Sequence, residues 1–157
     1  MRVSESAGRT LESNSEQETL DAGKRLAERL PPGSTVCLEG DLGAGKTVFA
    51  RGFAAGLGIA GPVTSPTFTL VNSYEGRATD GSARILHHFD LYRINDPEEL
   101  FGIGWDEYFD GEAVCLVEWP ERAGTLLPEN CCHVGIRRGP AHSEHRIITV
   151  GKEGRDA

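Results

Sequence analysis

Eight residues in the first third of the chain constrain its fold more than any other feature. The run from Gly40 to Thr47, GDLGAGKT, matches the phosphate-loop pattern G-x-x-x-x-G-K-[ST] at each fixed position. Glycines suit this run because the backbone must reach positive φ angles and turn its amides inward around an anion. Lys46 can then reach the outer phosphates of a nucleotide, and the hydroxyl of Thr47 can coordinate Mg²⁺. The pattern predicts a polyphosphate-binding loop.

The residues on either side supply the strand and the helix that such a loop needs. A β-rich run, TVCLE, occupies residues 35–39 and leads into the glycines. After the loop, apolar residues at positions 49, 50, 53, 54 and 57 follow helical spacing. The positive end of that helix dipole would face a bound phosphate. A chance Gly-Lys-Thr in a surface turn needs neither element, so the context favours a nucleotide site.

The rest of the chain indicates a mixed α/β fold. We expect a helix from the capping serines Ser13 and Ser15 to about residue 30, followed after the phosphate loop by a hairpin of strands 67–74 and 83–91. Short helices are expected near residues 96 and 105, and a buried strand over residues 113–118. A loop over residues 119–128 then leads to a last hairpin of strands 132–137 and 145–150. This order predicts a three-layer α/β sandwich of the P-loop NTPase type. Its central sheet should be mostly parallel, with antiparallel hairpin additions. We expect one such domain over residues 10–150, a flexible tail over 1–9 and a polar tail over 151–157.

Charge and composition restrict the partners and the compartment. The 157 residues carry a net charge of −8, which repels nucleic-acid backbones and disfavours tight, independent binding to them. No run of about 18 apolar residues occurs, and the polar N-terminus lacks a signal-peptide layout, so we expect a cytoplasmic protein. Cys37 and Cys115 lie in apolar runs and are expected to be buried thiols. Cys131 and Cys132, with histidines nearby, show no recognised zinc-ligand spacing.

Two carboxylates end predicted strands and are candidates for organising Mg²⁺ and its waters. Glu118 ends the run AVCLV, and Asp90 ends the run ILHHF. Strands of a parallel sheet point their C-terminal ends at the ligand, so both acids can approach the nucleotide. Glu118 follows the longer apolar run and is favoured for Mg²⁺, which leaves Asp90 to position water. The alternative for Asp90 is a turn or salt-bridge residue facing Arg93.

Three hydroxyl side chains, those of Thr64, Ser65 and Thr67, lie in the loop after the predicted helix. In many phosphate-loop proteins this loop senses the γ-phosphate, although such hydroxyls can equally satisfy their own backbone. The chain contains no Asn-Lys-x-Asp element, which favours ATP over GTP. Its arginines are scattered and form no lid-like cluster, but a small-molecule kinase remains the alternative to an ATP hydrolase.

Five motifs in matching order resemble the TsaE (YjeE) family, small bacterial ATPases. They are GDLGAGKT at 40–47, TSPTF at 64–68, HFDLYR at 88–93, DPEEL at 96–100 and LVEWP at 116–120. The resemblance implies ATP hydrolysis with Mg²⁺ in the pathway that installs threonylcarbamoyl on adenosine of tRNA. It also implies work beside the proteins TsaD and TsaB, with weak or indirect contact to tRNA.

The resemblance further implies roles for individual residues. The loop that wraps the phosphates comprises Asp41, Leu42, Gly43, Ala44, Gly45, Lys46, Thr47 and Val48. Thr47 and Glu118 hold Mg²⁺, and Lys46, Asp90 and Glu118 form the catalytic set. Thr64, Ser65 and Thr67 belong to a switch segment, and Trp119 belongs to the functional surface. The adenine is expected between the start of the N-terminal helix and the C-terminal hairpin, where Arg146, or Asn14 and Ser15, are candidate base contacts.

Overall fold

The computed structural model describes residues 8–41, 43–66 and 69–152. Leu42 of the predicted phosphate loop, Thr67 of the predicted switch segment, and most of both predicted tails lie outside these ranges. Within them, no helix has the length and apolar character needed to cross a lipid bilayer.

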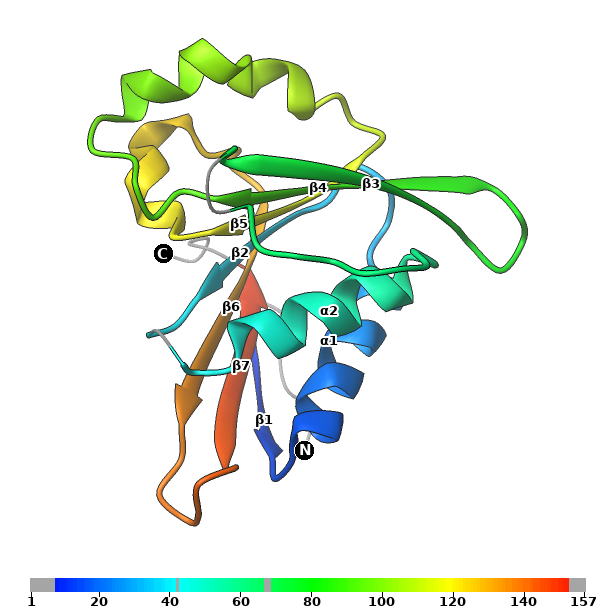
Figure 1. The fold of residues 1–157 in the computed structure, drawn as a ribbon, viewed down its shortest axis with the longest axis vertical. Helices are drawn as coiled ribbons and strands as arrows, with labels where there is room; N and C mark the ends of the chain where they lie inside the picture. The colour runs from blue at the N-terminus through cyan, green and yellow to red at the C-terminus, as the bar shows by residue number, and fades with distance from the viewer. Residues whose placement is uncertain (1–7, 42, 67–68, 153–157) are drawn as a thin grey trace.

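A seven-stranded mixed sheet forms the centre of the molecule, in the order β1-β7-β6-β2-β5-β4-β3 (Figure 1). Its strands are β1 (Arg9–Ser13), β2 (Thr35–Glu39), β3 (Val71–Arg77), β4 (Ala83–Asp90), β5 (Val114–Glu118), β6 (Cys131–Arg138) and β7 (Arg146–Lys152). The four inner strands β6, β2, β5 and β4 run parallel to one another. The pairs β3–β4, β6–β7 and β1–β7 are antiparallel, so the expected parallel centre with antiparallel hairpins is confirmed.

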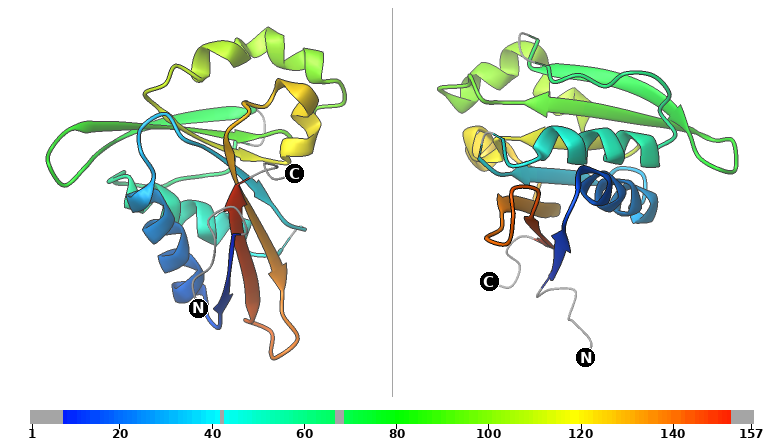
Figure 2. Two further views of the ribbon diagram at one scale, coloured as in Figure 1. Left: turned by 180° about the vertical axis from the view of Figure 1, so that it is seen from behind. Right: turned by 60° about the horizontal axis from the view of Figure 1, so that its bottom comes forward.

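Helices cover both faces of the sheet, as Figure 1 and Figure 2 show. The helices α1 (Glu16–Arg29) and α2 (Lys46–Gly56) lie on one face, and the 3-10 helices η1 (Pro97–Ile103), η2 (Trp105–Tyr108) and η3 (Pro120–Leu126) lie on the other side. Alternate residues of β5 serve the two cores: Leu116 packs with α1 and α2, whereas Val117 packs with the 3-10 helices. Such two-sided burial produces the predicted three layers.

The first two helices pack unusually closely because glycine lies at their contact. A Cβ added to Gly52 of α2 would stand 1.9 Å from the carbonyl oxygen of Leu20 in α1. The start of α1 is set by Ser15, whose hydroxyl accepts a hydrogen bond from the amide of Glu18. This close packing places the first turns of both helices at the same edge of the sheet.

Some elements differ from the sequence-based expectation. Strand β1 was not expected, since residues 9–13 lack a marked apolar alternation; it forms by adding to the edge strand β7. The segment predicted as a loop over 119–128 contains η3, which begins with Pro120 at its first position. The helix predicted at Asp96 is present with its capping box, but it is a 3-10 helix.

Candidate functional site

The phosphate loop joins β2 to α2 at the carboxyl edge of the parallel strands. Gly43 and Gly45 have φ angles of 80° and 112°, which a residue with a Cβ adopts only with strain. Gly45 is the N-cap of α2, so no capping side chain occupies the amides of the helix's first turn. These amides, together with the positive end of the helix dipole, suit an anion.

Two arginines of the C-terminal hairpin hold the loop from outside. The Arg138 Nη2 atom donates a hydrogen bond to the Gly43 carbonyl at 2.9 Å, and the Arg146 Nε atom donates to the Ala44 carbonyl at 2.8 Å. These two bonds fix the carbonyls of Gly43 and Ala44 toward the C-terminal hairpin. Arg138 and Arg146 therefore act as positioning residues for the phosphate loop.

Replacing Arg138 should weaken nucleotide binding without touching the pocket itself. Because one charge-assisted hydrogen bond on an exposed side chain contributes about 0.5–1.5 kcal/mol, Arg138→Ala should raise the Kd for ATP about two- to tenfold. Isothermal titration calorimetry measures this change. Arg137→Ala is the matched control, because Arg137 is an exposed neighbour on the same strand. Equal affinities of Arg138→Ala and the unmodified chain would exclude a role for this bond.

The two predicted acids lie side by side. Asp90 and Glu118 are register partners at the ends of β4 and β5, so both project at the edge where the loop begins. Glu118 is buried, and its Oε1 atom lies 4.0 Å from Nζ of Lys46. Its Oε2 atom lies 2.8 Å from Nε2 of His88, two positions before Asp90 on β4. The Nδ1 atom of His88 has no hydrogen-bond partner among the described residues. Glu118 thus lies between a lysine and an imidazole.

Asp90 belongs to a different set of contacts, at the entrance of the site. Its Oδ2 atom accepts a hydrogen bond from the Ser65 hydroxyl at 3.1 Å, and its Oδ1 atom accepts one from the Tyr92 amide. Ser65 thereby connects the predicted switch segment to the carboxyl end of β4. Thr64 lies outside the pocket and is bonded to β3 instead, because its carbonyl accepts from Asn72 and Tyr74.

Two aromatic side chains, those of Trp119 and Tyr92, line the site beside Lys46. Trp119 follows Glu118 directly and has a φ of 58°, a left-handed conformation that is uncommon for a bulky residue. Its ring lies beneath the Lys46 ammonium, with Nζ 4.5 Å from the ring centroid, and packs against Tyr92 at 4.9 Å. Left-handed residues of this kind concentrate at functional sites, and this one turns the Trp119 ring toward the loop.

These elements enclose a pocket of about 370 Å³. The lining residues come from the start of α1, the phosphate loop, the ends of β4 and β5, and the C-terminal hairpin: Ser15, Glu16, Thr19, Gly43, Gly45, Lys46, Thr47, Val48, Ser65, Asp90, Tyr92, Glu118, Trp119, Glu144 and Arg146. Asp41 lines the neighbouring groove, whereas Asn14 bonds to His142 of the hairpin. Of the candidate base contacts, Ser15 and Arg146 line this pocket.

Sequence reasoning assigned no role to His88, Tyr92 or Glu144. Strand alternation offered a signal for His88, because residues two apart on β4 share a face and Asp90 was already a candidate. Tyr92 lies beyond the strand end, where only tertiary packing against Trp119 reveals it. Glu144 comes from the β6–β7 turn, which approaches the pocket through a contact distant in sequence.

Burial and hydrogen bonds shift the pKa values of several groups under the 3-10 helices and near the start of β5. Burial lowers the pKa of His87, which faces Tyr108 under the 3-10 helices. Burial also raises the pKa of the Cys115 thiol to about 12, so this thiol stays protonated at neutral pH. Backbone hydrogen bonds to Asp110 lower its pKa in the turn before β5.

The donor set of the pocket fits a nucleoside triphosphate with Mg²⁺. One buried ammonium and the N-terminus of α2, whose first-turn amides carry no capping side chain, match phosphate oxygens. The Thr47 hydroxyl and the Glu118 carboxylate are oxygen ligands of the kind that Mg²⁺ prefers. Ser15 and Arg146, candidate contacts of the base, line the same pocket as Lys46 and Thr47.

Comparison with known proteins assigns the family. The family model described as threonylcarbamoyl adenosine biosynthesis protein TsaE matches residues 13–148. The tRNA threonylcarbamoyladenosine biosynthesis protein TsaE of Bacillus subtilis is 45% identical over 133 residues, which cover 85% of this chain and 78% of that protein. The Treponema pallidum protein of the same description is 44% identical over 125 residues, covering 80% and 88%. The crystal structure of Bacillus subtilis YdiB matches with a TM-score of 0.72 and 37% identity, over 95% of this chain and 89% of that one. The chain therefore belongs to the TsaE family.

Proposed function

We propose that this chain is a Mg²⁺-dependent ATPase that acts in the formation of threonylcarbamoyladenosine in tRNA, together with TsaB and TsaD. The observation that carries the proposal is the convergence of Lys46, Thr47, Asp90 and Glu118 on one pocket at the start of α2. A phosphate loop faced by two carboxylates is the arrangement that phosphoryl-transfer enzymes use. The pathway comes from the family, whose curated relatives are described as tRNA threonylcarbamoyladenosine biosynthesis proteins.

The loop and Lys46 supply binding and charge neutralisation. Loop amides and the first turn of α2 hold the phosphate oxygens, and Lys46 leaves its contact with Glu118 to pair with the outer phosphates. Thr47 and Glu118 would hold Mg²⁺, which when bound neutralises charge on the phosphates. Trp119 can retain its packing against Tyr92 while the ammonium moves.

Asp90 and Ser65 are placed to handle water at the same pocket. Asp90 accepts the Ser65 hydroxyl and lies beside Glu118 in the sheet, so the predicted switch segment is already attached to an acid of the site. A carboxylate in this position can orient a water molecule for in-line attack on the γ-phosphate. Loss or gain of the Ser65 bond would link the nucleotide state to the conformation of residues 61–66.

Hydrolysis by the isolated chain should be slow. Among the described arginines, Arg146 alone lines the pocket, and its guanidinium is bound to the carbonyls of Ala44, Ser143 and His145. It is therefore poorly placed to follow charge that develops on the γ-phosphate. Stabilisation by such an arginine accelerates phosphoryl transfer about 10³–10⁵-fold, so a partner that supplies or frees one has a large effect.

The test compares phosphate release by the isolated chain with release in the presence of TsaB and TsaD. We expect the partners to raise the rate by about tenfold or more. The same mixture containing Lys46→Ala should release only background phosphate, which excludes a contaminating ATPase. An isolated chain that is as fast as the mixture would contradict the proposal. Phosphate transfer to a small-molecule acceptor, without free phosphate, would identify the alternative function, a kinase.

A further inference from the structure

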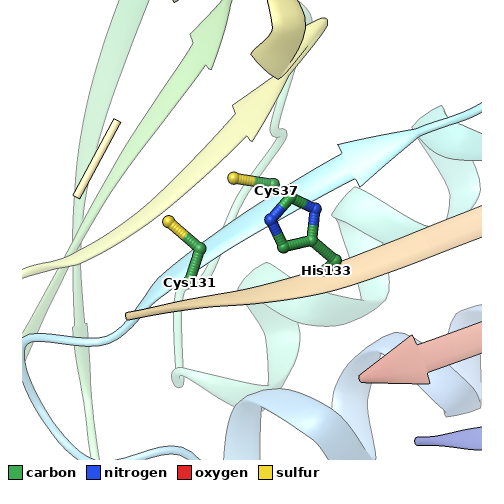
Figure 3. A group of neighbouring side chains, drawn as sticks. All are labelled: Cys37, Cys131 and His133. Atoms are coloured by element: carbon green, nitrogen blue, oxygen red, sulfur yellow. The ribbon is translucent and has the colours of Figure 1, made fainter. Parts of the chain in front are cut away.

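A second group of ligand-type side chains lies outside the nucleotide pocket. Cys37 of β2 and Cys131 and His133 of β6 have ligand atoms that all lie within 4.8 Å of one another. Figure 3 shows the two sulfur atoms pointing to the same side, with the imidazole ring of His133 beside Cys37. Cys37 and Cys131 are buried and His133 is half-buried. None of the three lines the nucleotide pocket.

The register of the sheet creates this group. Cys37 is the register partner of His133, and Cys131 lies two residues before His133, so all three project from one face. This face is opposite the one from which Val36 and Leu38 pack against α1 and α2. The group therefore depends on pairing between strands separated by about 90 residues of sequence, which explains why local spacing gave no zinc motif.

The same register disfavours a disulfide between the two cysteines. Cys131 is paired with Thr35, so it is the diagonal neighbour of Cys37. A strand spacing of about 4.8 Å and a rise of about 3.3 Å per residue place diagonal Cα atoms about 8 Å apart. A disulfide needs Cα atoms within about 7 Å, so oxidation would require the strands to move. A metal ion can bridge the longer span, because it adds a bond to each sulfur.

We propose that Cys37, Cys131 and His133 form a Zn²⁺ site. Two thiolates and one imidazole are ligands that select a soft or borderline ion, and Zn²⁺ accepts them with a water molecule in the fourth position. Tetrahedral Zn²⁺ with bonds of about 2.3 Å sets its sulfur ligands about 3.8 Å apart. Starting from separations of at most 4.8 Å, the side chains need to move together by about 1 Å.

Zn²⁺ binding at this site would replace the protons of the two thiols. The Cys131 thiol donates a hydrogen bond to the carbonyl oxygen of Pro128, and Zn²⁺ would take the place of the thiol proton. Each thiol loses one proton as its Zn–S bond forms, so one ion releases about two protons in addition to the change at its water ligand. The bound ion would join β2, which leads into the phosphate loop, to β6, which ends in the Arg138 that holds the loop.

The experiment titrates the full-length, untagged and reduced chain with Co²⁺, a spectroscopic substitute for Zn²⁺, without nucleotide. We expect one Co²⁺ per chain with a thiolate-to-cobalt charge-transfer band, and displacement of this band by one equivalent of Zn²⁺. The thermal midpoint should rise by about 5–10 °C at a Zn²⁺ concentration about 100 times the Kd. The absence of a charge-transfer band in the reduced chain would overturn the proposal.

Variants assign the ligands. Cys131→Ala and His133→Phe should both lose the one-equivalent Co²⁺ complex. His133→Phe is the safer variant for folding, because it keeps an aromatic ring at a half-buried position. Cys132→Ala is the matched control and should keep the band, because Cys132 packs toward the opposite core. Glu118→Gln should also keep it, which separates this site from Co²⁺ bound in the nucleotide pocket. A band that survives both ligand variants, or disappears in Cys132→Ala, would refute the assignment, as would a Cys37–Cys131 disulfide found by mass spectrometry.

Discussion

Lys46→Ala is expected to lower ATP turnover about 100- to 1,000-fold and to weaken ATP binding. Removal of one preorganised donor from a phosphoryl or oxyanion site has effects of this size. Lys46 is also buried, so the ammonium meets the phosphates where water competes little for them. Phosphate release at saturating ATP measures the first effect, and calorimetric titration measures the second.

The substitution also alters the resting site, so stability needs a separate measurement. Without the ammonium, the buried Glu118 carboxylate keeps its contact with His88 but loses the Lys46 charge 4.0 Å away. We therefore expect some loss of thermal stability, since a buried charge is costly when a partner is removed. Lys24→Ala is the matched control, because Lys24 is exposed on α1. Normal turnover in a folded Lys46→Ala protein would remove the basis of the phosphate-site assignment.

The phosphate loop was predictable because its chemistry depends on local sequence. Glycines at fixed intervals, a preceding strand and a following helix are all written in adjacent residues, and the structure places Gly45 at the start of α2 as expected. The buried strand before Glu118 was predictable for a similar reason, because a central parallel strand reads as an unbroken apolar run. Strands β2 and β4 pair with its two edges, and its residues pack into a separate core on each face.

Other parts of the fold depend on contacts that no local pattern contains. Strand β1 forms only because β7 offers an unpaired edge, and the hydrogen bonds from Arg138 and Arg146 to the loop cross about 100 residues of sequence. The 3-10 helix η3 carried a local signal in Pro120, but its seven residues contain Gly124 in a non-helical conformation, which weakens any periodic pattern. Elements of this kind follow from tertiary packing.

The sequence predicts that Asp90 and Glu118 approach the phosphate loop, but their different surroundings follow from tertiary contacts. Both carboxylates end parallel strands, so their arrival at the loop was expected. The structure separates them by their partners: Glu118 is buried between Lys46 and His88, whereas Asp90 is bound to Ser65 at the entrance. Burial beside Lys46, the proposed phosphate ligand, favours Glu118 for Mg²⁺, and the bond to Ser65 of the predicted switch segment favours Asp90 for water.

Glu118→Gln is expected to slow ATP hydrolysis about 100-fold or more while leaving ATP affinity within about threefold of its original value. The substitution removes the charge but preserves the shape and a hydrogen-bonding group for His88, so the site should keep its structure. Loop amides and Lys46 still hold the phosphates, which explains why binding survives. Phosphate-release assays give the turnover, and calorimetric titration of the same preparation gives the ATP affinity.

The Mg²⁺ dependence of this variant distinguishes the possible roles of the carboxylate. If Glu118 holds Mg²⁺, raising the Mg²⁺ concentration should partly restore turnover, because the lost ligand weakens metal binding. If Glu118 positions water instead, turnover should stay low at any Mg²⁺ concentration, and Asp90→Asn should show the metal-dependent recovery. Glu129→Gln, at an exposed carboxylate farther along the chain, should leave turnover unchanged. Full activity of Glu118→Gln at limiting Mg²⁺ would exclude both roles, because a neutral amide is a weaker metal ligand than a carboxylate and orients water less strongly.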